Sequence, residues 1–173
     1  MRRLSPVIAL VALAGFAGVA LAAPSSGLQE FGTGEVTIDG DAATLTNGAG
    51  EFSGVFLKSR SQSGKSLAAV DFSFAYSGST AGGAPRFSIP LDTGSTESVT
   101  PFAFVDALNC GDTGVVDTDA SNCQVFLNFS NESFANWDAF AAAHPTWRIA
   151  PGSIPFVIAD QPGTYELTDI ELR

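Results

Sequence analysis

Positively charged residues are scarce in this chain of 173 residues, which contains 8 Lys and Arg but 18 Asp and Glu and has a formal net charge of −10. Two of the basic residues, Arg2 and Arg3, stand at the very start, so the chain beyond residue 22 has a charge of −12, from 6 bases and 18 acids. A surface of this sign repels phosphate backbones and anionic lipids. We therefore expect neither nucleic acid nor a bilayer as a partner.

Cysteine and histidine are also rare. Cys110 and Cys123 are the only cysteines and do not form a Cys-x-x-Cys motif, which argues against a redox or metal role. In an exported chain such a pair predicts a disulfide, and closing a loop this short stabilises the fold by roughly 3 kcal/mol on the chain-entropy model. The lone His144, next to Pro145, fits a helix end better than a zinc ligand or a general base.

The first 22 residues have the pattern of a secretory signal peptide. Arg2 and Arg3 form a positive start, residues 7–21 are apolar or small, and Ala20-Leu21-Ala22 is a small-x-small cleavage site. A retained membrane anchor needs about twenty apolar residues followed by stop-transfer charges, and the run ends here in small residues and a proline. We expect cleavage after residue 22, a secreted product, and one domain over residues 23–173.

The remaining chain predicts strand after strand. The clearest case is Val70, Phe72, Phe74 and Tyr76, which alternate with polar or small residues and so predict a strand with one buried face. Further strands are predicted by the apolar runs at 36–38, 44–46, 54–57, 87–91, 102–104, 125–129, 154–158 and 165–172. Pro90 has no N–H to donate, which predicts an edge or a bulge at that point in its strand.

Only one stretch predicts a helix. Phe134, Trp137, Phe140 and Ala141 share one helical face, Ser133 precedes them as a candidate cap, and Pro145 ends the run. No internal repeat is found. About nine short strands and one helix predict an all-β fold, a two-sheet antiparallel β-sandwich of jelly-roll type with an aromatic-rich core.

One tetrapeptide looks like a catalytic motif. The strand at 86–91 runs into Asp92-Thr93-Gly94-Ser95, the way an aspartic protease presents its carboxylate. That chemistry needs two carboxylates that share a proton, and the chain has no second copy of the motif. Asp, Gly and Ser are also ordinary turn residues, so Asp92 is a weak catalytic candidate.

A glycosidase is a second enzymatic alternative, since it needs two carboxylates roughly 5–10 Å apart. Glu166, Asp169 and Glu171 place three acids in the last predicted strand. Their spacing differs from the Glu-x-Asp-x-x-Glu pattern of concanavalin-like glucanases. We therefore expect no catalysis there.

The same closing stretch, Tyr165-Glu166-Leu167-Thr168-Asp169-Ile170-Glu171-Leu172, resembles the last strand of secreted jelly-roll domains of the carbohydrate-binding-module and galactose-binding-like kind. The resemblance covers about ten residues. It implies a sandwich that binds a polysaccharide or a cell-surface glycan. It also implies a structural calcium where the first and last strands meet, with Asp169 and Glu30 as candidate ligands.

Glycan recognition needs aromatic surfaces and planar polar groups, for which Arg86, Trp137, Trp147 and Arg148 are the candidates in this chain. Each has an alternative role, because both tryptophans fit a core and both arginines fit pairing with carboxylates. The sequence thus predicts a secreted, non-catalytic binding module for carbohydrate, with a structural domain that binds a protein partner and a small hydrolase as alternatives.

Overall fold

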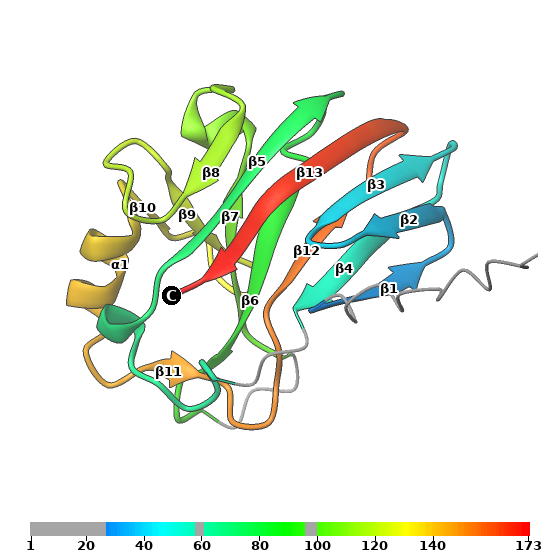
Figure 1. Ribbon diagram of the computed structural model, residues 1–173. Helices are drawn as coiled ribbons and strands as arrows, with labels where there is room; N and C mark the ends of the chain where they lie inside the picture. The colour runs from blue at the N-terminus through cyan, green and yellow to red at the C-terminus, as the bar shows by residue number, and fades with distance from the viewer. Residues whose placement is uncertain (1–26, 58–60, 96–99) are drawn as a thin grey trace, which may run out of the picture.

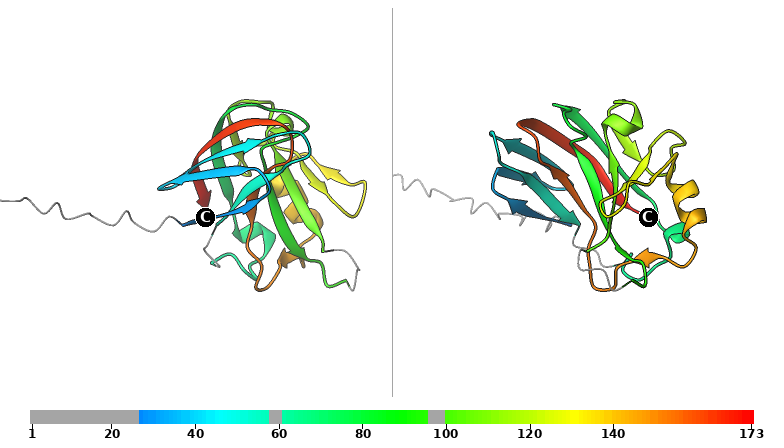
Figure 2. Two further views of the ribbon diagram at one scale, coloured as in Figure 1. Left: turned by 90° about the vertical axis from the view of Figure 1, so that its right-hand side faces the viewer. Right: turned by 180° about the vertical axis from the view of Figure 1, so that it is seen from behind.

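The computed structural model describes residues 27–57, 61–95 and 100–173. Thirteen strands lie in two antiparallel sheets that pack face to face as two layers (Figure 1, Figure 2). This arrangement confirms the predicted two-sheet antiparallel β-sandwich with one short helix. The predicted signal peptide, residues 1–22, lies outside the described residues. Within the described residues, no helix is long and apolar enough to span a bilayer.

The larger sheet has the strand order β1-β4-β12-β6-β7-β9-β10, and β11 pairs with the far end of β6. Its strands are β1 (Leu28–Gly32), β4 (Ser53–Leu57), β6 (Arg86–Asp92), β7 (Phe102–Asp106), β9 (Val125–Leu127), β10 (Ser133–Phe134), β11 (Arg148–Ile149) and β12 (Phe156–Ala159).

The smaller sheet has the order β2-β3-β13-β5-β8. Its strands are β2 (Glu35–Asp39), β3 (Ala42–Asn47), β5 (Phe72–Gly78), β8 (Val115–Asp117) and β13 (Gly163–Leu172). The remaining elements are the short 3-10 helices η1 (Leu67–Ala69) and η2 (Leu108–Cys110) and the helix α1 (Trp137–Ala143).

The core lies between the two sheets. Strand β5 contributes Phe72, Phe74 and Tyr76 to it, all buried, as their alternation predicts. The ring of Phe87 in β6 packs across the layers against Phe72 and Phe74, at centroid distances of 5.6 and 4.9 Å. Aromatic rings of both sheets therefore meet in the middle of the sandwich, in agreement with the predicted aromatic-rich core.

Strand β6 is internal, which corrects the expectation of an edge or bulge at Pro90. The strand pairs with β12 as far as Ser88 and with β7 from Arg86 to Pro90. On the β12 side, partner strand β11 begins only opposite Leu91. Pro90 occupies the gap between these two partners, where no N–H is needed, and its carbonyl accepts the N–H of Ala150 at 2.9 Å.

Strand β13 contains a bulge near Thr168-Asp169. The register with β5 shifts between Thr168 and Glu171, and Asp169 has a φ of 51°, in the left-handed region. The shift explains why apolar residues change parity along this strand.

Helix α1 begins one turn later than predicted. Its cap is Asn136, whose side chain accepts the N–H of Ala139 at 2.9 Å, whereas Ser133 belongs to strand β10. The predicted apolar face is correct, because Trp137, Phe140 and Ala141 are buried against the core. The Cys110 and Cys123 sulfurs lie 2.02 Å apart, as a disulfide that joins η2 to the loop before β9.

Candidate binding face

The outer surface of the larger sheet is lined with phenylalanine. In β4, Val55 and Leu57 are buried in the core, while Phe56 between them points the other way and is partly exposed. The same alternation repeats in β7, β9 and β12. We call the resulting surface the phenylalanine face, made up of Phe31, Phe56, Phe102, Phe104, Phe126 and Phe156.

The register of the strands brings these residues into contact. One row of paired residues crosses the sheet in the order Gln29, Phe56, Phe156, Ser88, Phe104, Phe126 and Ser133. Ser88 is 1% exposed, and its register partners on either side are Phe156 and Phe104. The small side chain of Ser88 thus lies between two large rings, and the row has no gap at this position.

Ring contacts continue beyond this row. The centroid of the Phe156 ring lies 5.4 Å from Phe56, 5.8 Å from Phe102 and 5.3 Å from Phe31. Phe102 and Phe104 lie parallel, with 4° between their planes. Phe31 lies over Gly54, where a Cβ atom would approach its ring to 2.5 Å. Ring contacts thus join five of the six residues, Phe31, Phe56, Phe102, Phe104 and Phe156, and Phe126 lies beside Phe104 in the register.

A hollow opens on this face beside β12 and β6. It has a volume of about 510 Å³ and is lined by Gln29, Phe56, Pro90, Thr100, Phe102, Ser153, Ile154 and Phe156. Apolar walls with a few polar groups are the usual composition of a ligand site. Within the described part of the chain, the side chains of Gln29, Thr100 and Ser153 make no hydrogen bond to protein groups, so they are free to bind a ligand.

Arg86 and Asp160 stand at one end of the face. The guanidinium donates two hydrogen bonds to the Asp160 carboxylate, at 3.1 and 2.6 Å, and lies 5.0 Å from the centre of the Phe104 ring. The Arg86 side chain is only 19% exposed. Arg86, predicted as a binding residue, therefore supports the face through its pairing and stacking.

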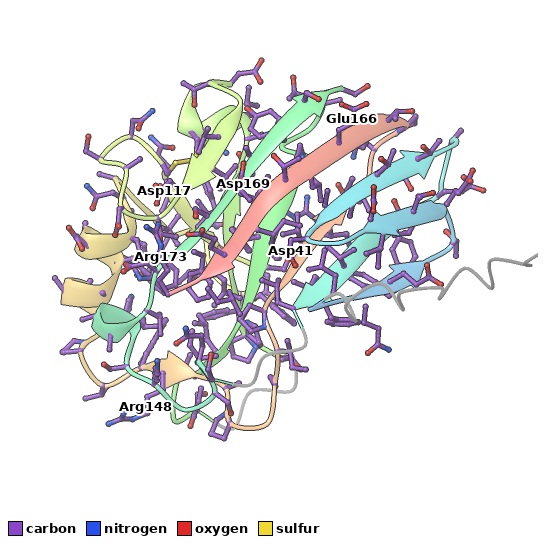
Figure 3. All side chains as sticks on the ribbon, viewed as in Figure 1. Asp41, Asp117, Arg148, Glu166, Asp169 and Arg173 are labelled. Carbon is purple, nitrogen blue, oxygen red and sulfur yellow. A yellow bond between two sulfur atoms is a disulfide. The ribbon has the colours of Figure 1, made fainter. Side chains whose placement is uncertain are left out.

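The other predicted binding residues lie elsewhere. Trp137 is 2% exposed and its indole N–H donates to the carbonyl of Leu67, so it belongs to the core. Trp147 is partly exposed and stacks on His144 at 3.6 Å. Arg148 is exposed on β11, where Figure 3 shows its side chain directed away from the body of the protein. These three side chains do not line the hollow.

The catalytic candidates have structural roles. Asp92 is exposed at the end of β6, and its carboxylate accepts the N–H of Gly94 at 3.0 Å. This contact fits the interpretation of Asp92-Thr93-Gly94-Ser95 as an ordinary turn. Glu166 accepts a hydrogen bond from Ser77 at 2.8 Å, and Glu171 lies 3.6 Å from Arg173. The contacts of Glu166 and Glu171 place these two acids on the surface of the smaller sheet, away from the hollow.

The two predicted calcium ligands lie in different sheets. Glu30 is in β1, which pairs only with β4 among the described strands, and Asp169 is at the bulge of β13 (Figure 3). The described residues contain no group of three or more His, Cys, Asp or Glu side chains that could hold a metal ion. A calcium site at Asp169 and Glu30 stays a prediction.

A second charged cluster closes the end of β13. The Arg173 guanidinium lies 3.5 Å from Asp117 and 3.9 Å from Asp119 (Figure 3), and the Arg173 backbone pairs with that of Asp71 through bonds of 2.9 and 2.8 Å. Burial raises the pKa of Asp71, and so does a hydrogen bond with the Asp119 carboxyl, although Arg173 lowers the same pKa. One arginine thus holds together several carboxylates.

No protein-family model, curated protein or solved structure matches this chain. The description of the candidate site therefore rests on its own geometry.

The phenylalanine face was missed in the sequence, although a signal for it exists. In Val55-Phe56-Leu57 and Val125-Phe126-Leu127, phenylalanine and aliphatic residues alternate, so both parities of the strand are apolar. Such strands are covered on both sides. The expectation of an aromatic-rich core did not distinguish rings inside the sandwich from rings on its outer surface.

Proposed function

We propose that this protein is a secreted, non-catalytic binding module that recognises carbohydrate through the phenylalanine face. The observation that supports the proposal most directly is the hollow, where three aromatic rings are bordered by the polar side chains of Gln29, Thr100 and Ser153. Sugar rings carry C–H groups on their faces and hydroxyls at their edges. Aromatic walls with polar groups at the rim complement both features.

The rest of the molecule has the opposite character. The outer surface of the smaller sheet carries acidic and hydroxyl side chains, such as Glu35, Thr44, Glu166 and Thr168, on strands whose other face is buried. An apolar surface confined to one side of an acidic protein marks an interaction site. This contrast favours a binding role for the larger sheet over a general structural role.

Affinity electrophoresis against a panel of polysaccharides tests the proposal, with and without EDTA. We expect at least one polysaccharide to retard the wild-type protein. Phe56→Leu and Phe156→Leu keep apolar bulk but remove the ring, so each weakens retardation by roughly tenfold, the effect expected from about 1.4 kcal/mol of stacking.

Leu108→Ala is the matched control. Leu108 is 59% exposed on η2, more exposed than any ring of the face, and does not line the hollow. We expect this variant to bind as the wild type does. Absence of retardation by every polysaccharide would remove the proposal, and retention of an unrelated protein instead would favour a protein partner.

A further inference from the structure

We infer that the ligand of the phenylalanine face is an uncharged polysaccharide, an inference that rests on the proposed function. None of the eight described residues that line the hollow carries a charge. Recognition of a uronate or sulfate group requires a cation in contact with the ligand, usually an arginine that binds it through two hydrogen bonds. The described lining of the hollow offers no such group.

Arg86, the arginine that lies over the ring of Phe104, is already occupied. Arg86 uses two N–H groups on Asp160, and its Nε–H is buried and has no hydrogen-bond partner among the described residues. Release of Arg86 for an anionic ligand would leave the carboxylate of Asp160 without its partner, although that carboxylate is two-thirds buried. The Arg86–Asp160 ion pair therefore presents no net charge to a ligand.

The charges at the other end of β6 also oppose an anionic ligand. Arg148, on β11, donates to the Gly64 carbonyl at 3.4 Å and does not line the hollow, and its partner in the register is an acid, Asp92. The net charge of the whole chain, −10, adds a repulsion that acts at long range. By contrast, an uncharged chain of sugars meets apolar side chains, hydroxyls and one amide along the described lining of the hollow.

Two consequences separate this inference from carbohydrate binding in general. Binding of an uncharged ligand does not depend on ion pairs, so its affinity changes by less than about twofold between low and high salt. Charged ligands behave differently, because screening weakens each of their ion pairs. Replacement of the exposed cation Arg148 is also expected to leave the affinity unchanged.

The experiment compares an uncharged β-glucan and an uncharged mannan with the anionic polymer polygalacturonate, at 20 mM and at 500 mM NaCl, by pull-down and affinity electrophoresis. We expect retention by an uncharged polymer only, equal at both salt concentrations and equal for wild type and Arg148→Gln. Phe156→Leu should weaken this retention by roughly tenfold in the same assay.

The outcomes are distinguishable. Retention by polygalacturonate, or affinity lost at high salt or in Arg148→Gln, would overturn the inference and leave carbohydrate binding intact. Retention by no polymer of any charge would overturn the proposed function and the inference with it.

Discussion

Trp137 provides the sharpest test of which aromatic residues belong to the core. Its ring is fully enclosed and makes edge contacts with Phe72 and Phe140, at centroid distances of 5.5 and 5.2 Å. Its N–H donates to the Leu67 carbonyl at 3.0 Å. Trp137→Phe removes both the hydrogen bond and part of the ring volume, while it keeps an aromatic side chain.

The magnitude follows from these two losses. A buried carbonyl without its donor costs about 1–3 kcal/mol, and roughly three missing ring atoms cost about 2 kcal/mol more. A loss of about 3–5 kcal/mol in the free energy of unfolding lowers Tm by roughly 10 °C in a domain of this size. The proposed carbohydrate binding should be unchanged in the folded variant.

Denaturant unfolding and calorimetry measure this effect, with Trp147→Phe as the control. Trp147 is partly exposed, so its replacement should cost no more than about 1 kcal/mol. The assignment of Trp137 to the core is refuted if Trp137→Phe keeps wild-type stability, or if the folded variant loses its ligand.

Two further predictions concern packing and pH. A Cβ atom at Gly34 would meet Asn47 Oδ1 at 2.1 Å, so Gly34→Ala should cost about 1–3 kcal/mol of stability. Gly48→Ala is the control, because its added atom meets only the end of the Glu51 side chain, at 3.1 Å. Equal melting temperatures for the two variants would contradict the predicted clash at Gly34. The raised pKa of Asp71 means that protonation stabilises the folded state below the ordinary pKa of an aspartate, and that this stabilisation is lost as the pH rises through the folded-state pKa. Asp71→Asn should therefore raise Tm at neutral pH and bring no gain in strong acid. A series of Tm measurements from pH 3 to 8 tests this expectation. A gain in Tm of the same size at every pH would rule out the titration of Asp71 as the cause of the gain.

The fold could be predicted because its strongest signals are local. Alternation from Val70 to Tyr76 identifies β5 and its buried face, and the parity change after Leu167 identifies the bulge in β13. The position of Pro90 could not be predicted, because it depends on where β12 ends and β11 begins. Those partners lie more than fifty residues further along the chain.

The candidate site was harder to predict for a related reason. Phe56, Phe104 and Phe156 come from strands far apart in sequence, and only the strand order of the larger sheet brings them into one row. Local patterns show that a strand is apolar on both sides but do not show which side faces the second sheet. Trp137 and Arg86 were candidates by residue type, and burial and pairing gave them other roles.

The location of the binding surface is the central claim, and an NMR titration tests it most directly. The protein, with its phenylalanine rings labelled with ¹³C, is titrated with short oligosaccharides of the polymer that retains it. We predict that the ring signals of Phe56, Phe102 and Phe156 shift with one common dissociation constant, while those of the core residues Phe72 and Phe87 stay in place. Shifts confined to rings outside the phenylalanine face, such as Phe129 beside Trp147, would contradict the account.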